Sequence, residues 1–265
     1  MPWASLSGGI VGLSLGLTGG GGSIFAVPLL VYGLRLDFRS SVALSLAVVG
    51  LTSLYGAVLQ ARRGQVLWGA GAVLGAGGII AAPLGAWLGG QMPERLSLLL
   101  FAGLMLTLGL RMIRRHQEVA ERPRSWISCQ RRLDGRPHFT LTCAGKLLVA
   151  GAVSGVLSGI FGVGGGFLIV PALLLVACVD IETALATSLV GIFLTAASAF
   201  AANVEYLGPG TGKLAPWFLA GSVAGMTLGT RLKAFISARG LRTLFGSAVL
   251  GVAGFVVLRN LLPMQ

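Results

Sequence analysis

Apolar runs long enough to cross a membrane recur along the whole chain. No residue from Met1 to Leu34 has a charged side chain, and similar runs follow at intervals to the C-terminus. About 20 consecutive apolar residues span the hydrocarbon core of a bilayer as a helix. The pattern predicts membrane segments at residues 3–34, 41–59, 66–90, 96–113, 147–179, 183–202, 214–230 and 241–258.

A polar, Arg-rich stretch separates the fourth apolar run from the fifth. We therefore divide the chain into a first membrane repeat at residues 1–114, a basic cytoplasmic connector at 115–146 and a second membrane repeat at 147–265. Hydrophobic residues make up 55% of the chain and charged residues only 11%, whereas soluble domains carry about 25% charged residues. No soluble domain of any size is expected.

The two halves resemble each other when the sequence is shifted by 143 residues without a gap. Polar positions match in this register, with Asp37 on Asp180, Ser45 on Ser188 and Thr52 on Thr195. The shift also places Gly12, Gly16, Gly19, Gly21, Gly22 and Pro28 on Gly155, Gly159, Gly162, Gly164, Gly165 and Pro171. Agreement of this extent indicates an internal duplication.

The first and fifth apolar segments each contain a run of glycines and exceed 30 residues. A straight helix of that length would measure about 50 Å, which is longer than a bilayer accommodates without steep tilt. Glycine is about 1 kcal/mol less favourable than alanine in a helix, so each run is a natural break. Each segment is then either a broken helix that still crosses or a hairpin that enters and returns.

The distribution of basic residues favours hairpins. With hairpins and a cytoplasmic connector, 15 of the 20 Lys and Arg residues lie inside, including Arg62, Arg63 and Arg231, as the positive-inside rule requires. Three crossings then remain in each half, so the halves insert in opposite orientations. We predict an all-α polytopic membrane protein of two inverted repeats, each with a glycine-broken helical hairpin plus three transmembrane helices.

Inverted hairpins bring the two glycine turns together near the midplane, where non-helical backbone is tolerated only if it is buried or lines a wet cavity. Short helices begin after each turn, and their free N–H groups favour an anion. Hydroxyl side chains on neighbouring segments could assist. The predicted substrate-binding residues are Gly19, Gly20, Gly21, Gly22, Ser23, Ser45, Thr52, Gly162, Gly164, Gly165, Gly166, Thr187, Ser188 and Thr195. Pairs of glycines four residues apart, at Gly12–Gly16, Gly155–Gly159 and Gly85–Gly89, are instead assigned to helix packing.

Other chemistry finds little support in the sequence. Both histidines, His116 and His138, lie in the connector, so no catalytic residues are expected within the membrane segments. The three cysteines have no paired spacing, which predicts no disulfide framework, no metal site and no cofactor. The acidic residues nearest the core, which include Asp37 and Asp180, are expected to cap helices or pair with arginines rather than relay protons. The net charge of +12 belongs to short loops, so no nucleic acid partner is expected.

The duplicated glycine pattern, seen as "GVGGGFLIVP" at 162–171, resembles the TauE/SafE sulfite exporter family. So do "ATSLVGIF" at 186–193, "RRGQVLW" at 62–68 and "GSVAGMTLGTRL" at 221–232. The resemblance implies export of sulfite or a small organosulfonate, such as sulfoacetate, across a bacterial inner membrane. The first half departs from the pattern, because Ser23 stands where the second half has Gly166.

Two alternatives to a sulfur-anion exporter remain open at this point. One is an anion channel of the same fold, and the other is a carrier for a different small anion, such as a carboxylate or an inorganic ion. The expected partners are a small anionic substrate, the lipid bilayer and a second copy of the chain in a homodimer.

Overall fold

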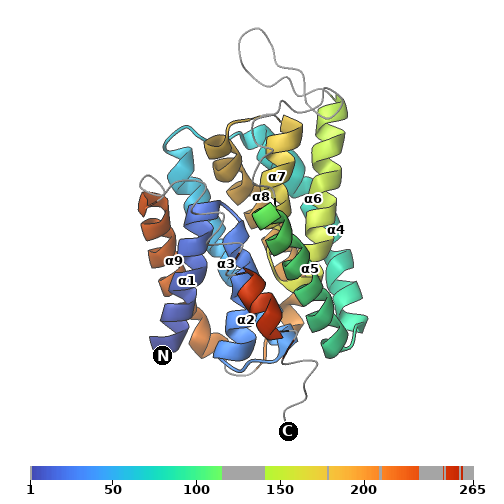
Figure 1. The fold of residues 1–265 in the computed structure, drawn as a ribbon. Helices are drawn as coiled ribbons and strands as arrows, with labels where there is room; N and C mark the ends of the chain where they lie inside the picture. The colour runs from blue at the N-terminus through green and yellow to red at the C-terminus, as the bar shows by residue number, and fades with distance from the viewer. Residues whose placement is uncertain are drawn as a thin grey trace.

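The computed structural model describes residues 2–114, 141–177, 179–208, 211–232, 247, 249–256 and 258, and no strand occurs among them. Its helices stand side by side as a bundle (Figure 1). Four of them contain a stretch long and apolar enough to cross a membrane, namely α3 (Phe38–Ala61), α4 (Trp68–Gln91), α6 (Leu141–Phe161) and α8 (Ile181–Asn203). The prediction of an all-α membrane protein is confirmed.

Two more helices coincide with predicted segments but fall outside that group of four. They are α5 (Glu94–Arg114) and α9 (Thr211–Leu232). A short 3₁₀ turn, η4 (Val204–Tyr206), links α8 to the chain before α9. Residues 249–256 are helical as well, within the last predicted segment.

The first glycine run breaks the chain where the sequence predicts. Helix α1 (Pro2–Thr18) ends directly before Gly19, whose φ of 67° is a left-handed value that glycine adopts readily. The returning arm consists of η1 (Gly21–Phe25), α2 (Ala26–Pro28) and the π-helical η2 (Leu29–Gly33). A Cβ atom on Gly33 would lie 4.0 Å from Ser7 Oγ, near the start of α1. The chain has thus come back beside its own beginning, so this segment is a hairpin.

The second glycine run repeats this arrangement. Helix α6 ends directly before Gly162, which has a φ of 70°. The returning arm consists of α7 (Gly166–Ala172) and the π-helical η3 (Leu173–Ala177), and both pack on α6. In each arm the π turn follows a proline. Because proline has no N–H group, it interrupts the regular i to i−4 ladder at that point.

The long helices after each hairpin begin with the same cap. The carboxylate of Asp37 accepts a hydrogen bond from the Ser40 N–H at the start of α3, and Asp180 accepts one from the Thr183 N–H at the start of α8, both at 2.9 Å. The Thr183 N–H also lowers the pKa of the Asp180 carboxyl below its ordinary value. The prediction that these two aspartates cap helices is confirmed.

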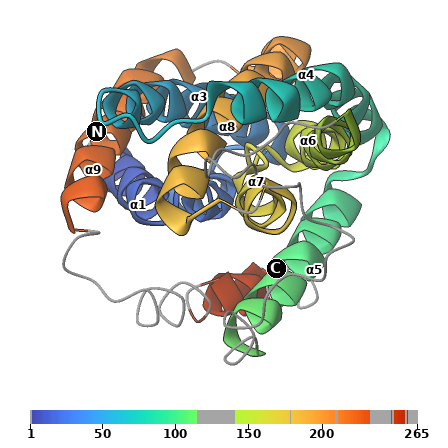
Figure 2. The same ribbon diagram turned by 90° about the horizontal axis from the view of Figure 1, so that it is seen from above.

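The two halves are packed into each other through glycine-lined helix contacts. Helix α1 lies along α9, and α6 lies along α4, in both views of the fold (Figures 1 and 2). A Cβ atom on Gly12 would meet the backbone of Ser222, and one on Gly155 would meet the backbone of Gly78. The glycines of the Gly12–Gly16, Gly155–Gly159 and Gly85–Gly89 pairs all lie at such contacts, which confirms their assignment to packing.

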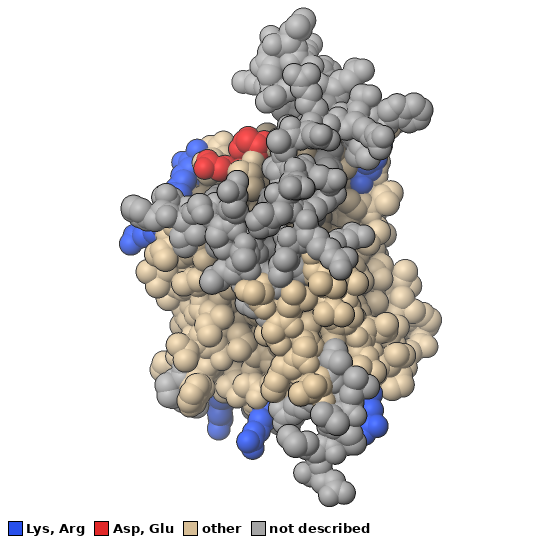
Figure 3. Space-filling view, in the orientation of Figure 1, with Lys and Arg blue, Asp and Glu red and all other residues tan. Residues whose placement is uncertain are grey.

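Charged residues gather at the two ends of the molecule, with an uncharged band between them on the face shown in Figure 3. Large apolar side chains are exposed among the described residues, including Trp3 at 71%, Ile80 at 74% and Trp87 at 61%. In water such exposure would be unfavourable, whereas lipid chains cover it. The surface therefore agrees with a multi-pass membrane protein.

The expectation about disulfides is wrong for one cysteine. Cys143 is buried and disulfide-bonded, and its partner lies outside the described residues. Spacing along the chain does not report which thiols meet in space. Both histidines and residues 115–140 of the connector also lie outside the part of the chain that the structure describes.

Candidate functional site

The two glycine turns meet backbone to backbone inside the bundle. A Cβ atom on Gly20 would lie 2.8 Å from the Cα and carbonyl atoms of Gly166, and a Cβ on Gly166 would crowd Gly20 in return. Real Cβ atoms essentially never approach other atoms so closely. Only glycine at both positions allows this contact between the halves of the chain.

Serines of the long helices hold the turns reciprocally. Ser45 Oγ on α3 donates to the Gly162 carbonyl oxygen at 2.7 Å, and Ser188 Oγ on α8 donates to the Gly19 carbonyl oxygen at 2.6 Å. Each serine therefore binds the turn of the other half, and the two bonds are related by the 143-residue shift. In this conformation both serine hydroxyls therefore donate to backbone carbonyl groups of the protein.

The centre of the contact is otherwise apolar. A Cβ atom on Gly164 would lie 2.8 Å from a methyl group of Val49 and 3.3 Å from one of Ile192, which are again equivalent positions in the two halves. Ser23 is fully buried at this place, and its Oγ donates to the Gly20 carbonyl oxygen at 2.8 Å. Its counterpart Gly166 has no hydroxyl, so the two turns differ chemically.

Backbone N–H groups at the turns lack acceptors. Gly20, Val163, Gly164 and Gly165 are buried, yet their N–H groups donate no hydrogen bond within the described part of the chain. Nearly all buried N–H groups in proteins are paired, and consecutive free N–H groups in a turn form concavities that bind anions. The turns therefore have the donors for an anionic ligand without any basic side chain.

The structure does not bring all of the predicted residues to the turns. Thr52 Oγ1 donates to Ser222 Oγ on α9 at 3.0 Å, and Thr187 Oγ1 accepts from the Leu67 N–H before α4 at 3.0 Å. Thr195 Oγ1 faces Gly78 on α4 and has no hydrogen-bond partner among the described residues. These three threonines contact α4, the loop before it, or α9, instead of the glycine turns.

One further expectation needs adjustment, namely that the short helix after the first glycine run starts at Ser23. In the first hairpin the returning arm starts as a 3₁₀ turn at Gly21 rather than as an α-helix at Ser23, and Gly22 packs against Ser14 of α1. Sequence reasoning also missed Ser154 on α6, whose Oγ donates to the Gly165 carbonyl oxygen at 3.0 Å. The sequence signal that could have identified Ser154 is its position on α6, about two helical turns before the glycine break.

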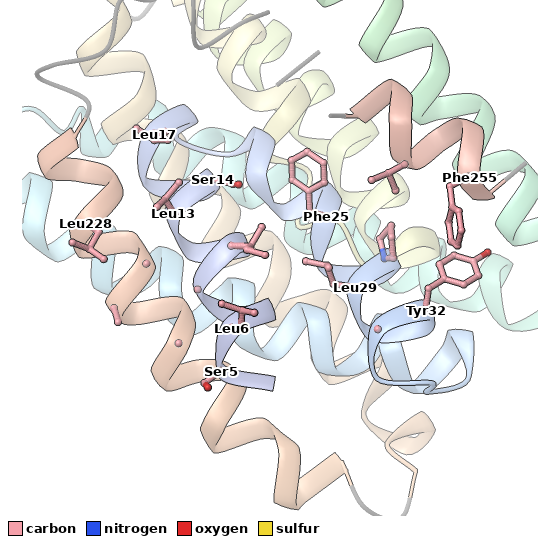
Figure 4. Close-up of a pocket in the computed structure, with 18 residues that line it drawn as sticks. Ser5, Leu6, Leu13, Ser14, Leu17, Phe25, Leu29, Tyr32, Leu228 and Phe255 are labelled. Atoms are coloured by element: carbon pink, nitrogen blue, oxygen red, sulfur yellow. The ribbon is translucent and has the colours of Figure 1, made fainter. Parts of the chain in front are cut away.

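A separate cavity of about 910 Å³ lies on the other side of the first hairpin. It is bounded by α1, the returning arm, α9 and the last described helix, with Leu6, Leu13, Phe25 and Phe255 around it (Figure 4). Its lining is almost entirely apolar. Such a surface suits hydrocarbon, and it does not have the donors that a small anion needs.

The apolar bundle, its exposed apolar surface and the buried contact between two hairpins are consistent with a membrane transporter. The comparisons agree, since residues 4–256 match the family model described as "Sulfite exporter TauE/SafE". The chain belongs to the sulfite exporter TauE/SafE family.

Similar proteins carry transporter names. A "Probable membrane transporter protein" of Xylella fastidiosa (strain Temecula1 / ATCC 700964) is 34% identical over 96% of this chain and 94% of its own length. The "Probable membrane transporter protein YdhB" of Bacillus subtilis (strain 168) is 28% identical over 58% of this chain and 59% of its own length. No solved structure matches the chain.

Proposed function

We propose that this protein is a secondary transporter that exports a small sulfur-containing anion, either sulfite or an organosulfonate such as sulfoacetate. The observation that carries the proposal is that buried residues where the two glycine turns meet have N–H groups that donate to no described residue. Sulfite and sulfonate oxygens are good acceptors for such donors. The name of the family supports a sulfur anion in particular.

The side chains at the turns favour a permanently charged substrate. Among the described residues there, the polar side chains are uncharged serines, and the other polar groups are backbone N–H and carbonyl groups. The serines are Ser23, Ser45, Ser154, Ser158 and Ser188. A sulfonate remains anionic at physiological pH and needs no acid–base partner. The negative interior of a cell would itself drive such an anion outward.

Alternating access would follow from the duplication. The reciprocal bonds of Ser45 and Ser188 are those of an interface with a two-fold axis, in which each half contacts the same surface of the other. We infer that the halves are inverted in the membrane and that the turns separate to admit substrate from one side at a time. The direct contact of Gly20 with Gly166 is then the closed state.

The same site gives no support to an enzyme. The described residues around the turns include no histidine, cysteine or acidic side chain that could act as a nucleophile or base. We propose that the protein catalyses no chemical reaction and uses no cofactor.

The proposal is tested by flux measurements on the purified protein in proteoliposomes. Uptake of labelled sulfite or sulfoacetate should saturate and should be inhibited by other sulfonates, with acetate, chloride and sulfate as weaker competitors. Linear, voltage-dependent current without saturation would indicate a channel instead. Saturable flux of a carboxylate but of neither sulfur anion would overturn the proposed substrate.

Variants of the two reciprocal serines connect the flux to the site. Ser45→Ala and Ser188→Ala each remove one donor to a turn carbonyl, a change of about 0.5–1.5 kcal/mol, so we expect the transport rate to fall roughly three- to tenfold. Thr107→Ala is the matched control, because that exposed hydroxyl donates only to the carbonyl of Leu104 in its own helix. Equal rates in all three variants would contradict a role for the turns.

A further inference from the structure

One face of α6 is turned toward the backbone that returns after the second glycine run. Ser154 Oγ on this face donates to the Gly165 carbonyl oxygen at 3.0 Å. Ser158 lies four residues further along and therefore on the same face, one helical turn nearer the break. The Gly162 N–H donates to the Ser158 carbonyl oxygen at 2.8 Å, which fixes Ser158 directly beside the turn.

Ser158 is the unusual member of this pair. Its side chain is fully buried, and its Oγ has no hydrogen-bond partner among the described residues. The next residues of the same hairpin, Val163, Gly164 and Gly165, have N–H groups that also donate to no described residue. Four donors of one hairpin thus have no partner among the described residues, although leaving even one buried donor unpaired is unfavourable.

The first hairpin has no such group. The 143-residue shift places Val11 and Leu15 of α1 opposite Ser154 and Ser158, and both of these residues are buried and apolar. The internal symmetry is broken at this point: α6 has two serine hydroxyls where α1 has apolar side chains, while the buried hydroxyl of the first hairpin, Ser23, is already paired with the Gly20 carbonyl oxygen.

We infer that Ser158 is a substrate contact and that the second hairpin, rather than the first, holds the anion. The Ser158 hydroxyl and the N–H groups of Val163, Gly164 and Gly165 donate to the oxygens of the sulfur anion, while the first turn closes over it through Gly20. The inference deepens the proposed transport function and rests on it.

The test uses the full chain with Ser158→Ala. Removing an unpaired buried hydroxyl should leave the melting temperature of the ligand-free protein in detergent unchanged or raised. The concentration of sodium sulfite that half-saturates flux, and that half-saturates thermal stabilisation, should rise about tenfold, the loss expected for one hydrogen bond to a charged group. If Ser158 had a merely structural role, the substitution would change the melting temperature of the ligand-free protein and leave the half-saturating sulfite concentration unchanged.

The matched control is Ser53→Ala. Ser53 on α3 is likewise fully buried with an unpartnered hydroxyl among the described residues, and its removal should leave half-saturation unchanged. Should Ser158→Ala fail to fold, Ser158→Cys keeps the shape with a much weaker donor and should show the same rise.

Three outcomes would overturn the inference. Half-saturation equal to that of the unmodified protein would remove Ser158 from the site while leaving the transport proposal intact. Stabilisation by sodium gluconate equal to that by sodium sulfite, and lost in Ser158→Ala, would show a cation site. Absence of saturable sulfite or sulfonate flux in the unmodified protein would instead refute the transport proposal, and the inference with it.

Discussion

At the scale of single residues, glycines form the turns at the centre of the molecule and serines hold these turns in place. Gly162, Gly164 and Gly165 all have φ values between 66° and 70°, a left-handed conformation that side chains with a Cβ adopt only with strain. The serines of α3 and α8 then hold the turns by their carbonyl groups. The N–H groups of Gly164 and Gly165 donate to no described residue, so the same turn can be held in place and still offer donors.

Replacement of Gly165 tests this reading of the turn. Its φ is 70°, and an added Cβ would collide with Ser154 Oγ, so Gly165→Val should abolish sulfite flux. Gly103→Val on α5 is the control, because a Cβ there meets no atom within 4 Å, and it should transport normally. Size-exclusion profiles and melting temperatures should show that both variants fold; a folded and active Gly165→Val protein would reduce the turn to a packing feature.

At the scale of helices, the glycines of α1 and α6 serve close packing between the halves. Helices in lipid gain little from the hydrophobic effect against each other, so association depends on close van der Waals contact and hydrogen bonds. Along α1 the would-be Cβ atoms of Gly8, Gly12 and Gly16 all meet the backbone of α9. These glycines determine how near the helices come, while the glycines of the turns determine the site.

The packing role predicts a loss of stability rather than a selective loss of transport. In Gly12→Val the new side chain meets the Ser222 backbone, which cannot move aside as a flexible side chain could. Overpacking of this kind destabilises by about 1–3 kcal/mol or more, so the melting temperature and the folded yield should both fall. Gly145→Val on α6, where a Cβ meets nothing within 4 Å, should match the unmodified protein. An unaltered melting temperature in Gly12→Val would contradict the close contact of α1 with α9.

At the scale of the whole molecule, the halves are connected by reciprocal contacts and not merely placed side by side. Each hairpin packs its first helix on a helix of the other half, α1 on α9 and α6 on α4 (Figure 2). Neither half can be removed without exposing the glycine face of the other. Movement of one half relative to the other therefore has to change the turn contact, the packing of these two helix pairs, and the contacts of α8 with α3 and α4.

Orientation in the membrane is a prediction at this scale. Inverted halves place Arg62 and Arg231 on the cytoplasmic side and Arg39 and Lys213 on the outside. Single cysteines are placed at these four positions in a protein whose native cysteines are replaced by serine. On intact cells a membrane-impermeant maleimide should label the cysteines at positions 39 and 213 and should not label those at positions 62 and 231. Sulfite flux of the serine-replaced parent is the control. Labelling of Arg62→Cys and Arg231→Cys from opposite sides would exclude the hairpin topology.

Features that depend on neighbouring residues could be predicted from the sequence. Apolar runs specify membrane helices because hydrocarbon excludes charge, and glycine runs specify breaks because they favour left-handed turns over helix. The caps at Asp37 and Asp180 follow from the same local logic, and the duplication is visible as a fixed register.

The partners of side chains across the chain could not be predicted in this way. Ser45 and Gly162 are 117 residues apart, and Ser188 and Gly19 are 169 residues apart, so the pairing depends on how the halves pack. Thr52 and Thr195 are equivalent in sequence, yet one has a hydroxyl partner on α9 and the other faces a glycine.

The sequence by itself determined that this protein is a duplicated membrane protein broken at two glycine runs, since hydropathy and backbone preference are properties of local segments. Only the tertiary structure decided which atoms meet at the break. It placed Gly20 on Gly166 and left turn N–H groups with no acceptor in the described part of the chain, because contacts between distant segments arise from packing the whole bundle at once.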